Sequence, residues 1–254
     1  METQLGTALQ GRTARQEIGR FLVEAVLLVG AMLVYWLLRG AVPERIAESF
    51  SRANNIIRLE ERLGIFVEPR WQESIIDNLA FVKIANWIYL WAHLPVLIIG
   101  GIWVYLRNRE RYRVYRNALL ISAVVGLFSY MFFPVAPPRL LPEWGFVDTV
   151  VLLNPENYNL QPGFLVNHYA AVPSLHVGWA LLVGIALFDV DRGVPVRVFA
   201  VLLPLAMFFS VVLTANHFIF DIIVGTVIVL AAVAVAFVME NRRLGVLRLR
   251  RQQT

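Results

Sequence analysis

The chain has no cysteine at all, and lysine and histidine are scarce. Lys83 is the single lysine among 254 residues, and there are four histidines. The lack of cysteine excludes disulfide frameworks, thiol nucleophiles and zinc–thiolate sites. Charged residues are also few, at 16%, whereas 58% of the residues are hydrophobic. This composition is far from the average of soluble domains and is typical of a polytopic membrane protein.

Apolar runs dominate the chain between its polar ends. They predict an all-α fold with six transmembrane helices, at residues 21–38, 79–106, 118–133, 175–188, 196–215 and 218–239. The same pattern predicts three regions: a cytoplasmic N-terminal arm (1–20), a six-helix membrane domain (21–240) and a basic cytoplasmic tail (241–254). The membrane bilayer is the expected partner, and nucleic acid is not.

The segment between the first two spans is the most charged part of the chain. Its apolar residues recur at helical spacing beside polar ones, at Ile46, Phe50, Ala53, Ile57 and Leu63. This pattern predicts a helix that lies along the membrane interface. The segment can serve as a folded cap over a site or as a plain connector, and the sequence leaves both open. The same holds for the proline-containing loop 139–172, which is either a lid or a connector.

The distribution of arginines predicts how the chain is oriented in the membrane. Residues 107–116, predicted as a loop, hold five arginines against Glu110, and the tail holds five more. Short loops rich in arginine stay in the cytoplasm. The sequence therefore predicts a multi-pass protein of the cell membrane with both termini in the cytoplasm. Arg139, His176, His217 and Asp221 then all fall at extracytoplasmic ends of spans.

These side chains fit phosphoryl transfer. Ionisable residues at membrane depth are functional candidates, and Asp221 follows His217 by one helical turn, which lets it hold the imidazole in one tautomer. One neutral histidine can attack phosphorus while the other protonates the departing alkoxide. Arg139 suits a phosphate group, and Ser174 is a candidate N-cap whose helix start favours anions. No metal or cofactor is required by this chemistry.

Three alternatives stay open. His176 and His217 can be packing residues near helix ends. Two histidines and one carboxylate also match a facial iron triad. A lipid transporter without chemistry is the third possibility. His168 and Tyr169 precede Ser174 closely and are either substrate contacts or ordinary loop residues, and His93 is either packed or a ligand.

The residues also carry a resemblance. Pro173-Ser174-Leu175-His176 and His217-x3-Asp221 resemble the second and third motifs of the type 2 phosphatidic acid phosphatase superfamily, whose patterns are K-x6-R-P, P-S-G-H and S-R-x5-H-x3-D. With Ala136-Pro137-Pro138-Arg139, the chain is similar to the inositol phosphorylceramide synthase-like branch. The resemblance covers roughly residues 56–229. It implies six spans, an external active site, a lipid phosphate substrate, His217 as nucleophile, His176 as general acid and Asp221 as the partner of His217.

The departures from those motifs concern positive charge. Phe132 stands where the first motif has lysine, and Val211 stands where the third has arginine. Only Arg139 is carried over, so Arg70, His168 or Tyr169 would have to replace the missing groups. Hydrolysis and transfer to an acceptor alcohol share the same histidine intermediate, and both stay open.

Overall fold

The computed structural model describes residues 14–153 and 167–252. Within these ranges the chain is helical and contains no β-strand, only one isolated bridge between Val135 and Ala170. The predicted all-α class is therefore confirmed. The part of the 139–172 loop that holds Pro155, Pro162 and Gly163 lies outside the described residues.

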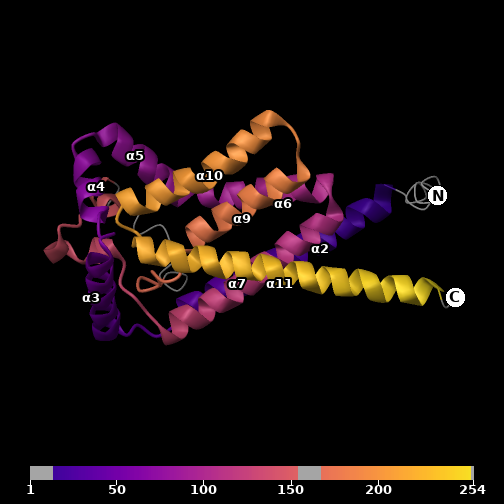
Figure 1. The fold of residues 1–254 in the computed structure, drawn as a ribbon, viewed down its shortest axis with the longest axis horizontal. Helices are drawn as coiled ribbons and strands as arrows, with labels where there is room; N and C mark the ends of the chain where they lie inside the picture. Colours follow the sequence, from indigo (N-terminus) through magenta and orange to yellow (C-terminus); the bar gives the residue numbers. More distant parts are fainter. Residues whose placement is uncertain (1–13, 154–166, 253–254) are drawn as a thin grey trace.

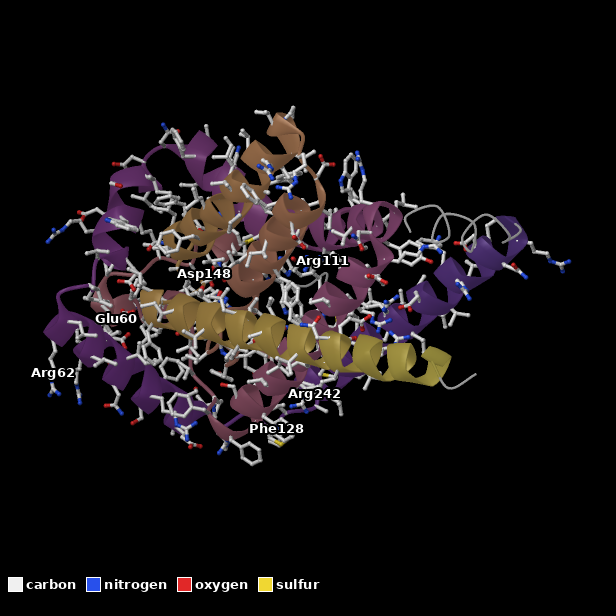
Figure 2. The ribbon with its side chains drawn as sticks, turned by 45° about the vertical axis from the view of Figure 1, so that its right-hand side comes forward. Glu60, Arg62, Arg111, Phe128, Asp148 and Arg242 are labelled. Carbon is white, nitrogen blue, oxygen red and sulfur yellow. The ribbon has the colours of Figure 1, made fainter. Side chains whose placement is uncertain are left out.

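Five helical stretches are long and apolar enough to cross a membrane. They are α2 (Ala14–Gly40), the continuous stretch from α5 (Leu79–Trp87) through a π-helical turn, η1 (Ile88–Ala92), to α6 (His93–Arg107), then α7 (Arg109–Phe132), α10 (Val194–Leu213) and α11 (Ile219–Gln252). Large apolar side chains face outward along them, as Phe128 does in Figure 2. The chain is a multi-pass membrane protein. The sixth predicted span is the 16-residue helix α9 (Leu175–Val190), too short to count on length, so the number six stays a prediction.

Helix α9 is the centre of the bundle. It packs against α6, α7, α10 and α11, which surround it in Figure 1. Most of its residues are buried and it is apolar on every face, the pattern of a helix enclosed by others. Helix α9 is thus short and enclosed by other helices, and its N-terminus lies inside the bundle.

Helix α3 (Ile46–Leu63) is the predicted interfacial helix. Figure 1 shows it lying across one end of the bundle, with α4 (Glu68–Ile76) beside it. Ala53 and Ile57 are fully buried in a cluster with Val135 and Phe218. The helix ends at Gly64, whose φ of 70° suits glycine. The segment is therefore a folded part of the protein that packs against this end of the bundle.

One sequence-based boundary needs correction. Residues 107–116 are mostly helix, because the Asn108 side chain caps α7 by accepting from the backbone N–H groups of Glu110 and Arg111 at 3.0 Å. Arginine is a good helix former, so a dense run of arginines is compatible with helix. Helix α2 begins at Ala14 and α11 runs on to Gln252, so helix continues into the segments predicted as arm and tail.

The two chain ends lie at the same end of the bundle, opposite α3 (Figure 1). Ion pairs join helices at that end: Arg113 with Glu240 at 2.6 Å, and Arg107 with Asp191 at 3.2 Å. Figure 2 accordingly places Arg111 and Arg242 far along α11 from its first turn, whereas Glu60 and Asp148 lie near that turn. An even number of membrane crossings, such as the predicted six, would place both ends on one side of a membrane.

Candidate active site

The first turns of α9 and α11 are in direct backbone contact. The N–H of Ser174 donates to the carbonyl oxygen of Asp221 at 3.0 Å. Gly225 makes this possible, because a Cβ there would collide with the carbonyl oxygen of Ser174 and lie 2.9 Å from its carbonyl carbon. Gly178 faces the same contact, since a Cβ there would lie 3.1 Å from the Gly225 oxygen. Two glycines thus bring together segments that are far apart in the sequence.

This contact places the two histidines side by side. The ring centroids of His176 and His217 are 5.8 Å apart, close enough for one phosphate group to touch both. His217 Nδ1 lies 3.3 Å from Asp221 Oδ2, and the same oxygen accepts from the Phe218 N–H at 3.0 Å. When Nδ1 donates to Asp221, the lone pair is on Nε2. The pairing of His217 with Asp221 that the sequence predicts is present in the structure.

Arg139 is fixed by the turn between α10 and α11. Its backbone N–H donates to the carbonyl of Ala215 at 2.7 Å, and its Nη1 donates to Asn216 Oδ1 at 2.7 Å. Its Nε lies 3.4 Å from Asp148 Oδ2. Nη2 makes no hydrogen bond within the part of the chain that the structure describes. The guanidinium is therefore held on one side and free to bind an anion on the other.

One cavity of about 390 Å³ joins these groups. Its polar end holds both histidines and Arg139, together with Arg39, Tyr89, His93, Tyr130, Asn167, His168 and Asn216. Its other end is apolar, with walls from α2, α6 and α7 that include Leu28, Val29, Met32, Leu33, Leu97, Ile98 and Leu119. Val29, Leu33 and Ile98 are each more than half exposed. The apolar end therefore opens onto the outer surface of the bundle between α2 and α6.

One arginine of the polar end escaped the sequence reasoning, and one histidine was left open there as a packed residue or a ligand. Arg39, in the last turn of α2, stacks 5.7 Å from the Tyr130 ring, and its buried Nε has no hydrogen-bond partner among the described residues. Its position at the outer end of the first apolar run was the available signal. His93 lies 4.7 Å from the His176 ring and stacks on Trp179. It follows the π-helical turn η1, a feature frequent at functional sites.

The remaining sequence candidates differ in position. His168 lines the cavity, and burial together with the charge of Arg139 lowers its pKa. Ser174 is the N-cap residue of α9, but its hydroxyl makes no capping bond, is fully buried and stays off the cavity wall. Tyr169 packs against Phe50 at 6.3 Å, and Arg70 is exposed on α4. The geometry gives no support to a phosphate contact by these last three residues.

A metal centre gains no support either. Within the described residues, no three histidine, aspartate or glutamate side chains are arranged to hold one ion together.

Comparison with known proteins agrees with the motifs. A family model described as the PAP2 superfamily matches residues 54–235. A curated protein from Bacteroides thetaiotaomicron named phosphoinositol dihydroceramide synthase is 23% identical over 179 residues, which are 64% of this chain and 57% of that protein. The chain thus spans little more than half of that relative's length. No solved structure matches this chain. Because the family model covers well over half of the sequence, the chain belongs to the PAP2 superfamily, whose members are phosphatases or phosphotransferases.

Proposed function

We propose that this protein transfers a phosphoryl group from a lipid phosphate ester at the extracytoplasmic face, through a phosphohistidine intermediate on His217. One observation carries the proposal: a single cavity has His176, His217 and two arginines at one end and an apolar wall that opens between α2 and α6 at the other. Such a shape fits a phosphorylated head group whose acyl chains remain in the bilayer.

The first step would break the ester bond. His217 Nε2 attacks phosphorus, the P–O bond to the leaving group breaks, and protonated His176 gives its proton to the departing alkoxide. Asp221 stabilises the positive charge that develops on His217. In the second step, neutral His176 takes the proton of an attacking hydroxyl, the N–P bond breaks and His217 is regenerated.

Arg39, beside the motif residue Arg139, would supply positive charge that the motifs lack. Nε of Arg39 has no hydrogen-bond partner among the described residues, and the side chains of Arg39 and Arg139 both line the cavity. Fixed donors that face a phosphate stabilise the charge of the transition state in a site that excludes water. Arg39 thus replaces one of the missing motif cations in this proposal.

Transfer to an acceptor alcohol is favoured over hydrolysis. His217 is only 5% exposed and Asp221 is fully buried, and α3 covers the adjacent end of the bundle. A site closed to bulk water favours an alcohol as second nucleophile. The name of the Bacteroides relative, a synthase, points the same way.

The proposal includes an orientation. Both termini lie in the cytoplasm, residues 21–240 form the membrane catalytic domain, and α3 lies on the outer face. The arginine-rich residues 107–116 and the shared end of the two termini support this arrangement.

The experiment that tests the function uses purified protein in detergent and radiolabelled lipid phosphates, with and without candidate acceptor alcohols. A new labelled phosphate ester of the acceptor is expected when acceptor is present: a phosphomonoester from a monoester donor and a phosphodiester from a diester donor. Free phosphate from a monoester donor identifies a hydrolase instead. His217→Ala and His176→Ala should abolish either product while the protein stays folded. Full activity in His217→Ala would refute the proposed nucleophile.

A further inference from the structure

The first turn of α11 is capped by three carboxyl groups from three different helices. Phe218 N–H donates to Asp221 of α11 itself at 3.0 Å. Ile219 N–H donates to Oε1 of Glu68 on α4 at 2.9 Å, and Phe220 N–H donates to Oε1 of Glu60 on α3 at 2.7 Å. The opening N–H groups of a helix have no partner within the helix and need such acceptors. The two outer helices thus supply part of this cap.

Glu60 and Glu68 are an unusual pair, because both are completely buried. Glu68 Oε2 accepts from the Val67 N–H at 2.9 Å, whereas Glu60 Oε2 receives no hydrogen bond from the described residues. Two adjacent buried carboxyls cannot both carry a charge without a large cost. Burial and the neighbouring Glu68 raise the pKa of Glu60 to about 9. At neutral pH Glu60 therefore holds a proton, which it can donate to Glu68.

We propose that Glu60 and Glu68 share one proton and act as a positioning pair that holds the first turn of α11, and with it Asp221 and His217, in the geometry needed for catalysis. Figure 2 shows Glu60 beside this turn. The pair accepts hydrogen bonds from the backbone of Ile219 and Phe220, two residues and one residue before Asp221. The inference rests on the proposed function of His217 and gives helices α3 and α4 a role in that function.

The pair predicts a pH effect with a definite sign. The ionisable groups that face Glu60 are Glu68 from α4 and Asp221 from α11, and both raise its pKa. The pKa of Glu60 in the folded protein lies above the ordinary value of 4.5. The free energy of unfolding therefore falls as the pH rises between these two values. Above about pH 9 Glu60 loses its proton, and its negative charge beside Glu68 and Asp221 loosens the first turn of α11. The catalytic rate falls as a result.

Glutamine at position 60 imitates the protonated acid, because its oxygen can accept from Phe220 and its amide can donate to Glu68. Glu60→Gln should keep the wild-type kcat near pH 7 and remove the decline in rate near pH 9. Glu60→Ala leaves the Phe220 N–H without an acceptor and should lower kcat about tenfold or more with KM unchanged. Glu61→Gln, an exposed neighbour on the same helix, is the matched control and should change neither.

Hydrogen exchange gives a readout that does not depend on activity. Amide exchange of residues 218–222 should be faster in Glu60→Ala than in wild type and unchanged in Glu60→Gln. Wild-type exchange and kcat in Glu60→Ala, or an unchanged alkaline decline in Glu60→Gln, would overturn the positioning pair. If wild type forms no product from any lipid phosphate, the proposed function fails by itself, and the exchange result still decides whether the pair holds α11.

Discussion

Replacing Gly225 by alanine should separate the two catalytic helices. The added Cβ would lie 2.9 Å from the carbonyl carbon of Ser174 and collide with its oxygen. Because ordinary carbon–carbon contacts begin at about 3.5 Å, α11 must move away from α9 by about 0.6 Å or more. The obstacle is backbone that also donates to Asp221, so no side-chain rotation relieves the contact. Overpacking of this kind costs about 1–3 kcal/mol.

The consequence for catalysis follows from where the histidines lie. His176 is in the first turn of α9, and His217 lies two residues before the start of α11. Misplacing reacting groups by about 1 Å costs about a hundredfold in rate. Gly225→Ala should therefore lower kcat by about ten- to a hundredfold in the labelled lipid phosphate assay, in protein that still elutes as a folded species in detergent.

Gly101→Ala on α6 is the matched control for this change. A Cβ at Gly101 meets nothing within 4 Å, so this variant should keep both wild-type kcat and wild-type thermal stability. If Gly225→Ala is as active as Gly101→Ala, the close approach of α9 and α11 does not set the geometry of the site, and the reasoning from this contact is refuted.

Three further predictions concern charge, metal and topology. Arg39→Ala and Arg139→Ala should each lower kcat/KM about tenfold or more, because each removes a charge-assisted hydrogen bond to phosphate. Arg70→Ala is the control and should have no effect. Equal losses at all three positions would contradict a specific role for Arg39. Activity should persist after exhaustive treatment with a chelator, whereas a loss restored by a divalent cation would favour a metal mechanism. Because the chain has no cysteine, a single introduced cysteine reports on which side of the membrane it lies. Arg62→Cys should react with an impermeant maleimide on intact cells, and Arg242→Cys only after permeabilisation. Labelling of both from one side would contradict the proposed orientation.

Much of the site was visible in the sequence because its chemistry is local. Asp221 follows His217 by four residues, a spacing that lets the two side chains meet at the start of one helix, and the structure shows their contact. The pairing of His176 with His217 needed only that two apolar runs form a hairpin. Arg139 was marked by prolines that end α7 and turn the chain back toward the bundle.

The residues that sequence reasoning missed depend on tertiary contacts. Arg39 looked like one of several arginines at a span end, and only the packing of α2 shows that it faces the cavity. Glu60 lies in a helix rich in charge, where an acid is normally solvated. Its burial arises because α3 docks onto the first turn of α11, and no local pattern records that docking. The sequence left His93 open as a packed residue or a ligand, and only the tertiary packing shows that it lines the cavity beside His176.

The central claim is a covalent phosphohistidine on His217, and trapping it is the most direct test. Purified protein is mixed with radiolabelled lipid phosphate without acceptor, quenched in base to preserve the N–P bond, digested and analysed by mass spectrometry. The account predicts an acid-labile, base-stable label on the peptide that contains His217, lost on addition of acceptor and absent from His217→Ala. Turnover by wild type with no label at this position, or the same label on His217→Ala, would contradict it.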